Sequence, residues 1–207
     1  MIERKVSYMN KPVSVTPTKP ATSTRVVLGP RTRFSYCNIW EPRSINGGNP
    51  KYSMSAIIPK DDLQTVNAVN AAIESAYRDG EAKLKGKGAL PPLAALKTPL
   101  RDGDLERPDD PAYAGCWFLN ANSDKAPGIV DAACNPILDH SEVYSGCYGR
   151  VSVTFFAFNS NGNRGIACGL NNIQKLKDGE SLGGTISAET EFAAFAEATG
   201  DEEDFLS

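Results

Sequence analysis

The sequence predicts a mainly β fold, a small antiparallel barrel of about five strands with one main helix and long loops. Three observations lead to this prediction. Five segments are rich in aromatic and β-branched residues, glycine- and asparagine-rich turns separate them, and a single segment has the apolar spacing of a helix. A two-sheet sandwich of the same strands is the alternative architecture.

The first two strands are expected at residues 33–40 and 51–58. Glu41-Pro42 should end the first strand, and the glycine-rich turn at 44–50 should lead into the second. Residues 62–79 form the one expected long helix, with an aspartate to cap its start, an apolar stripe along one side and Gly80 to end it.

The remaining strands follow a long connection at residues 81–115. A third strand is expected at 116–122 and a short one at 129–131. The strongest strand pattern is 147–158, and the turn residues at 159–163 should fold it into a hairpin with 165–176. Connections as long as 81–115 are uncommon within a compact domain and are often functional or mobile.

The composition is that of an ordinary globular chain. Its 207 residues are 41% hydrophobic and 23% charged, and they are enough for one well-buried core. No run of 18 apolar residues is present, and the N-terminus lacks the apolar segment of a secretory signal. The five cysteines form no Cys-x-x-Cys pair, which predicts reduced thiols and a cytoplasmic location.

Charge is distributed very unevenly along the chain. Residues 1–177 contain all 22 Lys and Arg and 16 Asp and Glu, whereas residues 178–207 contain nine carboxylates and no cation. A basic body favours a polyanionic partner, and a mobile acidic tail can compete with that partner for the same surface. We expect the tail to fold back on the empty groove and to dock partner proteins through Asp201, Glu202, Glu203, Asp204 and Phe205.

The strand at 147–158 suggests what the polyanion is. One of its faces is core-like, while the other carries Tyr148, Arg150, Phe156 and Phe158 among hydroxyl groups. Rings that stack on bases beside a cation that contacts phosphate are typical of single-strand binding surfaces. Packing of both phenylalanines under the helix explains the same residues equally well.

Similar pairs of aromatic and basic residues occur on the other strands. Together with the 147–158 strand they give two sets of candidates. We predict phosphate contacts from Arg33, Lys51, Lys125 and Arg150, and base stacking on Tyr36, Trp40, Tyr52, Trp117, Tyr148, Phe156 and Phe158.

Signals for catalysis are weak. The carboxylates between Asp102 and Asp110 could hold Mg²⁺ in a nuclease or resolvase, but a solvated loop is the favoured interpretation. His140 is the only histidine, the cysteines do not have zinc-ligand spacing, and Gly47-Gly48 lacks the lysine of a phosphate-binding loop. We therefore expect a non-enzymatic protein with no metal and no cofactor. A phage assembly protein that binds no DNA is a further alternative.

Several stretches resemble a family of tailed-phage single-stranded DNA-binding proteins. They are 34–60, 99–123, 127–137 and 142–184, including the strings FSYCNIWEPRSINGGNPKYSMSAIIPK and CYGRVSVTFFAFNSNGNRGIACGLNNIQKL, together with the acidic end. The resemblance covers most of residues 33–184. It implies an oligonucleotide-binding (OB) barrel that coats single-stranded DNA during phage replication or recombination.

The resemblance also sets the expected division of the chain. It keeps residues up to 184 with the OB domain, which leaves an acidic tail at 185–207. The start of the domain comes from composition, because 10–24 is rich in Pro, Thr and Ser and the pattern changes at Arg25, which predicts a flexible arm at 1–24 and the OB domain at 25–184. The expected partners are single-stranded DNA and the replication or recombination proteins that dock on the tail, in the host cytoplasm and without a membrane. We also include a second copy of the chain among the candidate partners, as a homodimer.

Overall fold

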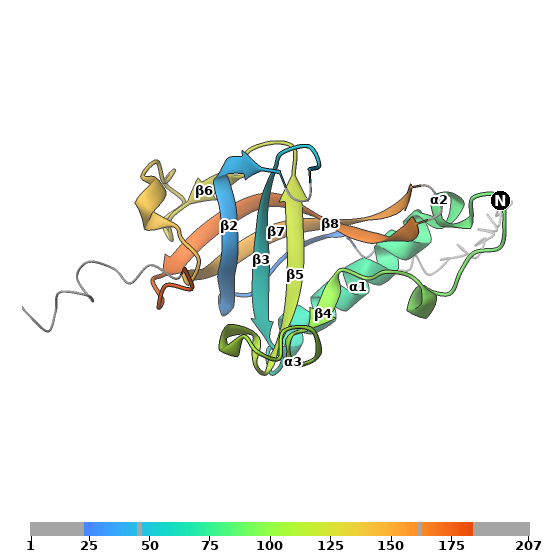
Figure 1. Cartoon of the computed structure of the whole chain (residues 1–207), viewed down its shortest axis with the longest axis horizontal. Helices are drawn as coiled ribbons and strands as arrows, with labels where there is room; N and C mark the ends of the chain where they lie inside the picture. The colour runs from blue at the N-terminus through green and yellow to red at the C-terminus, as the bar shows by residue number, and fades with distance from the viewer. Residues whose placement is uncertain (1–22, 45–46, 161–162, 184–207) are drawn as a thin grey trace, which may run out of the picture.

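The computed structural model describes residues 23–44, 47–160 and 163–183. The predicted tail and nearly all of the predicted arm therefore lie outside the described residues. Within them the chain forms mainly β structure (Figure 1). The long strands are β2 (Thr32–Arg43), β3 (Lys51–Pro59), β5 (Cys116–Ser123), β7 (Tyr148–Ser160) and β8 (Asn163–Lys177), and the short ones are β1 (Arg25–Val27), β4 (Leu100–Asp102) and β6 (Gly128–Val130).

The five long strands pair in a closed ring. Their order is β7-β2-β3-β5-β8, and β8 returns to β7 along the whole of a long antiparallel hairpin. Four of these pairings are antiparallel, but β5 and β8 pair in parallel through Asn122 and Gly169. The ring of five strands confirms the predicted mainly β, OB-type fold.

The structure corrects the prediction in three details. The barrel is not purely antiparallel, because β8 reaches β5 after a crossover that leaves both strands running the same way. Strand β2 does not end before Glu41-Pro42 but continues to Arg43, which pairs with Lys51 beyond an irregular stretch where a proline is tolerated. The short strands β1 and β4 have no distinct sequence pattern and extend the sheet at its edges.

Helix α1 (Leu63–Asp79) forms as its sequence predicts. The Asp62 carboxylate accepts a hydrogen bond from the Thr65 N–H, and the N–H of Gly80 closes the last turn on Ala76. Its apolar side, including Val66, Val69 and Ile73, is buried against the barrel. The core therefore lies between α1 and the inner faces of the strands, and it includes the fully buried Phe34 and Phe155.

The 81–115 connection is folded rather than open. It contains the short helices α2 (Glu81–Lys85) and α3 (Gly103–Glu106), strand β4, and two single 3₁₀ turns, η1 (Leu93–Ala95) and η2 (Pro111–Tyr113). A third 3₁₀ turn, η3 (His140–Glu142), precedes β7. Helix α2 lies beside the far end of the β7–β8 hairpin, which extends beyond the barrel alongside α1 (Figure 1).

Candidate nucleic-acid interface

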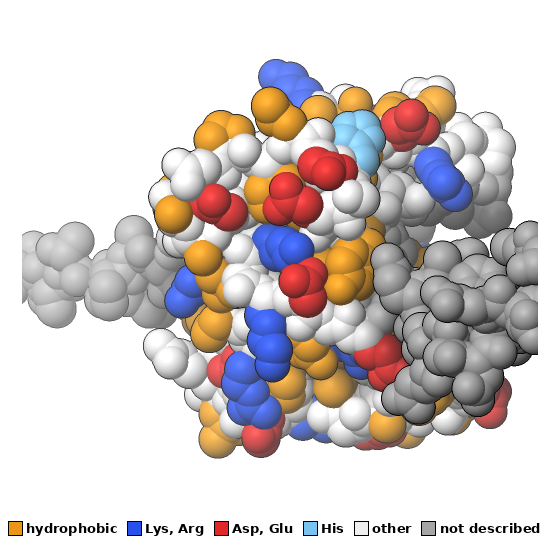
Figure 2. Space-filling view, turned by 90° about the vertical axis from the view of Figure 1, so that its left-hand side faces the viewer, with side chains coloured by type: hydrophobic (Ala, Val, Ile, Leu, Met, Phe, Trp, Pro, Cys, Tyr) orange, Lys and Arg blue, Asp and Glu red, His pale blue; other side chains and the backbone are white. Residues whose placement is uncertain are grey.

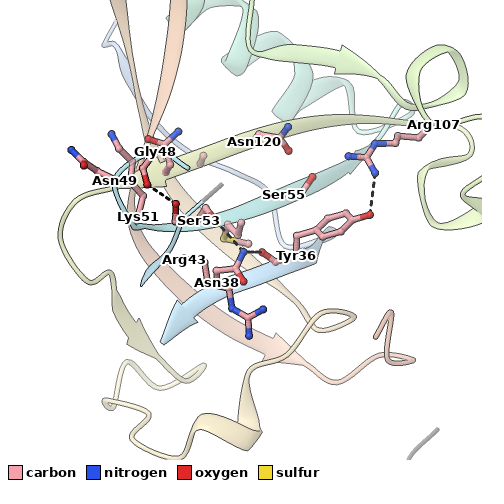
Figure 3. Close-up of a pocket in the computed structure, with 14 residues that line it drawn as sticks. Tyr36, Asn38, Arg43, Gly48, Asn49, Lys51, Ser53, Ser55, Arg107 and Asn120 are labelled. Carbon is pink, nitrogen blue, oxygen red and sulfur yellow. Dashed lines mark hydrogen bonds between the residues drawn. The ribbon is translucent and has the colours of Figure 1, made fainter. Parts of the chain in front are cut away.

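A groove with a volume of about 740 Å³ crosses the outer face of the barrel (Figure 3). Strands β2, β3 and β5 form its floor, and the loop between β2 and β3 forms one end. In an OB fold, the second and third barrel strands, which correspond here to β3 and β5, form the usual binding face together with this loop. The lining residues are Tyr36, Asn38, Arg43, Ser44, Gly48, Asn49, Lys51, Ser53, Met54, Ser55, Arg107, Asn120, Ala121 and Asn122.

The groove floor is built from polar pairs that face each other across strands. Ser53 lies opposite Asn122 and Ser55 opposite Asn120, and Asn38 donates a hydrogen bond to the Ser53 hydroxyl. Side chains alternate along a strand, so these residues point outward while Met54 and Ala56 point into the core. The floor therefore presents hydroxyl and amide groups, which can both donate to and accept from a ligand.

Tyr36 is directed into the groove by an irregularity of β2. The register between β2 and β3 shifts between Ser35 and Asn38, and Tyr36 has a φ of 48°, which is uncommon for a residue other than glycine. Bulges of this kind turn a side chain away from the regular pleat and often occur at binding sites. The ring of Tyr36 is 54% exposed as a result.

Arg107 closes the groove from the opposite side. Its Nη1 donates a hydrogen bond to the Tyr36 hydroxyl at 3.0 Å, and its guanidinium lies 5.3 Å from the centre of the Tyr36 ring (Figure 3). It also lies 5.4 Å from the Tyr113 ring and 5.9 Å from the Phe118 ring. A cation is thus fixed beside an exposed ring, an arrangement that suits a phosphate next to a stacked base.

The acidic loop at 101–110 holds Arg107 in position. The Lys60 ammonium contacts the Asp102 carboxylate at 2.6 Å and the Asp104 carboxylate at 2.7 Å, and Asp104 also accepts the Gly115 N–H. Gly103 is required within this turn, because a Cβ there would lie 2.3 Å from the carbonyl oxygen of Tyr113. The loop is therefore fastened to the barrel at several points.

Electrostatics reinforce the same contacts. Hydrogen bonds from Lys60 and from the Gly115 backbone lower the pKa of Asp104. The pKa of Glu106 is lowered by Arg101, with which it forms an ion pair. Both carboxylates are thus kept ionised and matched to a cation in the free protein.

A small second core anchors the loop from below. Tyr113, Phe118 and Ile57 bury one another on the outer side of the sheet, and the Tyr113 ring meets the Phe118 ring edge to face at 5.1 Å. The buried Tyr113 hydroxyl bonds to the Ser55 hydroxyl at 3.1 Å, which links this cluster to the groove floor. The loop is therefore anchored on the outer side of the sheet, next to the groove floor.

The metal-site alternative for this loop does not match its geometry. Asp102, Asp104 and Glu106 are paired with Lys60 and Arg101, and within residues 23–44, 47–160 and 163–183 no group of three or more His, Cys, Asp or Glu side chains is arranged to hold a metal ion. Nor does any helix in the described part of the chain have the length and apolar character needed to cross a membrane.

Two of the eleven predicted DNA-binding residues line the groove. These are Tyr36 and Lys51, and the Lys51 ammonium also contacts the Asp124 carboxylate at 3.3 Å. Lys125 is exposed just beyond β5, near Asp124. Tyr52 alternates with the groove residues and lies half-buried on the side of β3 that carries Met54.

Three further predicted residues, Arg33, Tyr148 and Arg150, lie on strands β2 and β7. Arg33 lies over the Tyr148 ring at 5.6 Å and donates to the carbonyl of Glu180 at 2.9 Å. Its buried Nε has no hydrogen-bond partner. Arg150 donates to the side chain of Gln174.

The two tryptophans have partners within the protein. Trp40 stacks on His140 with the ring centres 4.3 Å apart and donates from Nε1 to the Val143 carbonyl. Trp117 lies under the Lys60 ammonium at 5.1 Å. Phe156 and Phe158 lie on the outer face of the hairpin, where Phe156 is 48% exposed.

Sequence reasoning missed Arg107 and most of the groove floor. Alternation could have indicated Ser53, Ser55, Asn120 and Asn122, since polar residues recur at every second position in two strands that were both predicted. Nothing local to the sequence could have indicated Arg107, because its position depends on the folding of the whole loop.

The residues that precede the tail pack next to the groove. Tyr144 donates to the Gly179 carbonyl, the Leu182 N–H donates to the Ser145 carbonyl, and the Leu182 side chain packs on the second core. A smaller cavity of about 230 Å³ separates Leu182 and Gly183 from Tyr36, which also lines the main groove. The described chain therefore ends beside the candidate site.

The face of the molecule that lies at the left of Figure 1 carries both signs of charge. In Figure 2, Lys and Arg side chains gather over the middle and lower part of one face, with Asp and Glu side chains between and above them. A polyanion would therefore be attracted by local groups of cations rather than by a uniformly positive face.

Comparison with known proteins agrees with this architecture. The family model described as "Enterobacter phage Enc34, ssDNA-binding protein" matches residues 24–206. The chain belongs to this family. The Enc34 family assignment covers all of the barrel and its long connection, and so confirms the family resemblance predicted from the sequence.

Individual relatives support the assignment. A protein of Acyrthosiphon pisum secondary endosymbiont phage 1, "Putative protein p50", is 29% identical over 168 residues, which cover 77% of this chain and 88% of that protein. The single-stranded DNA-binding protein of bacteriophage Enc34, solved in complex with ssDNA, is 25% identical with a TM-score of 0.63, over 77% of this chain and 90% of that chain. The fold is also that of gp2.5 from bacteriophage T7, at 14% identity and a TM-score of 0.56, over 78% and 96% of the two chains.

Proposed function

We propose that this Enc34-family protein binds and coats single-stranded DNA with little dependence on sequence, in phage DNA replication or recombination in the host cytoplasm. The observation that carries the proposal is the groove on the OB-type binding face, in which the exposed Tyr36 ring lies beside the Arg107 cation. Family membership and the ssDNA complex of the Enc34 protein support the same conclusion.

Within the groove, each kind of side chain has a distinct role. Tyr36 stacks on a base, which is compatible with any sequence because every base has a π-face. Arg107, Arg43 and Lys51 contact phosphates, so that binding releases counterions. The serine and asparagine groups of β3 and β5 accept hydrogen bonds from base edges or donate to them.

The protein acts by binding alone. The carboxylates that could have held a metal are instead paired with Lys60 and Arg101, where they fix the loop that carries Arg107. Their role is therefore to shape the binding site rather than to perform hydrolysis.

The acidic tail regulates the same groove. The described chain ends at Gly183 beside Tyr36, so the carboxylates at 185–207 are attached next to the site that phosphates would occupy. We propose that Asp201–Asp204 compete with DNA for the groove cations, and that bound DNA displaces them and exposes Phe205 and Leu206 to replication or recombination partners.

A titration with labelled oligonucleotides tests the proposal. Fluorescence anisotropy with a single-stranded oligonucleotide and with the matching duplex should show tighter binding to the single strand, whose bases are free to stack. After incubation with Mg²⁺ the strand should remain intact on a denaturing gel. Cleavage of the strand would favour a nuclease, and absence of any binding would favour an assembly protein.

A further inference from the structure

We propose that the DNA strand bound in the groove continues across the joint between β5 and β8 onto the outer face of the β7–β8 hairpin. There Phe156 and Phe158 stack on further bases, and cations at the far end of the hairpin contact phosphates. This inference rests on the proposed function, because it extends the same binding site.

The two faces of the hairpin differ in what they contact. The inner face packs on helix α1: Ile166 and Cys168 are buried there, and a Cβ at Gly80 would lie 2.1 Å from the Ala157 Cβ. The outer face instead carries the exposed Phe156, the partly buried Phe158, Ala167 and Gly169, and Gly165, which is buried. Phe156 is 48% exposed, whereas Phe155, on the inner face, is 1% exposed.

The glycines of β8 allow the two rings to lie close to the strand. A Cβ at Gly169 would lie 3.3 Å from the Phe156 ring, and one at Gly165 would lie 3.0 Å from the Phe158 ring. An aromatic ring that covers a glycine shields the backbone on one side. The half-exposed Phe156 ring then offers its other side to a base.

This aromatic face is continuous with the groove. Asn122 lines the groove and pairs directly with Gly169 across the β5–β8 joint. The site of a Cβ on Gly169 is 4.0 Å from the Asn122 carbonyl oxygen and 3.3 Å from the Phe156 ring. A strand that leaves the groove over Asn122 therefore reaches Phe156 directly.

Basic residues surround the far end of the hairpin. Lys97 is paired with Gly165, next to Phe158, and Arg164 donates to the Leu84 carbonyl at the end of α2. Helix α2 contributes Lys83 and Lys85 at the same end, where its one carboxylate, Glu81, lies in the first turn. These four basic residues form a cationic rim around the end of the hairpin. Their charge suits a phosphate backbone that runs along the hairpin.

Oligonucleotides of two lengths test the proposal. One of about 4 nucleotides fills the groove alone, and one of about 16 reaches the hairpin, the two limits of strand occupied by single OB folds. Phe156→Ala should weaken binding of the long oligonucleotide about tenfold or more and leave the short one unchanged. Tyr36→Ala is the matched control and should weaken both lengths.

Salt dependence tests the cationic rim separately. Lys97→Ala should lower the slope of log affinity against log salt for the long oligonucleotide by about 0.7, the value for one phosphate contact on a single strand. Lys177→Ala, which removes an exposed lysine at the opposite end of β8 from Gly165, is the control and should leave this slope unchanged. Circular dichroism shows whether each variant remains folded.

The outcomes separate this inference from the proposed function. If the wild type binds both lengths and Phe156→Ala binds each of them as tightly as the wild type does, the hairpin is not part of the DNA path, although the protein still binds DNA. If sedimentation shows that Phe156→Ala changes the oligomeric state while DNA affinity is unchanged, the face contacts protein instead and the inference is wrong. If the wild type binds neither oligonucleotide, the proposed function itself fails.

Discussion

Arg107 and Tyr36 are 71 positions apart in the sequence, yet the Arg107 guanidinium donates a 3.0 Å hydrogen bond to the Tyr36 hydroxyl and lies 5.3 Å from the ring centre. The pair joins the acidic loop at 101–110 to the groove. It brings together the two chemical groups that a single-stranded nucleic acid requires, a ring for a base and a cation for a phosphate.

The Tyr36 ring should contribute more to DNA affinity than its hydroxyl. Tyr36→Ala removes the stacking surface and should weaken binding by about 1–3 kcal/mol, whereas Tyr36→Phe retains the ring and should bind nearly as well as the wild type. Anisotropy titrations of the two variants against the same oligonucleotide measure the difference. Equal losses in both variants would show that the hydrogen bond to Arg107, and not stacking, dominates.

The buried hydroxyl of Tyr113 should stabilise the anchoring of the acidic loop on the barrel. Tyr113→Phe removes its hydrogen bond to Ser55 and leaves that hydroxyl without this partner, which should lower the free energy of unfolding by about 1 kcal/mol. Urea denaturation followed by circular dichroism measures the change. Tyr77→Phe, which removes a bond to the Pro91 carbonyl in a half-buried position, is the control and should cost no more. A Tyr113→Phe variant as stable as the wild type would contradict this role.

Acid should loosen the loop. The pKa values of Asp104 and Glu106 are lower in the folded protein than their ordinary values near 4, so their contribution to stability is present above about pH 4 and is lost as the pH falls through the lowered values. Protection of the amides of residues 101–115 against hydrogen exchange, taken relative to the intrinsic exchange rate at each pH, should therefore fall below about pH 4. Asp104→Asn should show this lower protection already at neutral pH, and protection that stays constant across this range would refute the assignment.

Removing the tail should tighten DNA binding. Deletion of residues 188–207 removes seven carboxylates that compete for the groove cations, so affinity at low salt should rise. A full-length variant with Asp201, Glu202, Glu203 and Asp204 changed to the corresponding amides retains the chain length and should show part of the same increase. Unchanged or weaker binding by the deletion variant at low salt would rule out competition.

The sequence predicted the elements of the barrel better than their contacts. Alternation and turn residues located all five long strands and helix α1, since these signals act within a few residues. The parallel pairing of Asn122 with Gly169 joins segments 47 positions apart, and no local pattern encodes it. Similarly, the aromatic and basic content of the strands indicated Tyr36 and Lys51 but could not separate them from Trp40, whose ring stacks on His140.

The acidic loop shows most clearly why the site was only partly predictable. From its sequence, 101–110 is a solvated loop or a set of metal ligands, because the spacing of carboxylates does not reveal their partners. In the structure the partners are Lys60, Arg101 and the Gly115 backbone, and Lys60 lies more than forty positions away from the carboxylates it holds. The same folding brings Arg107 to the groove.

The most direct test of the central claim is the salt dependence of binding to an oligonucleotide of about 4 nucleotides, which fills the groove alone, measured for the wild type and for Arg107→Ala. If the groove cations contact three or four phosphates, wild-type affinity should fall about 20- to 50-fold between 50 and 200 mM salt. The Arg107→Ala variant should bind more weakly with a slope smaller by about 0.7. Binding that does not change with salt, or a variant with the wild-type affinity and slope, would contradict the claim that single-stranded DNA binds in this groove.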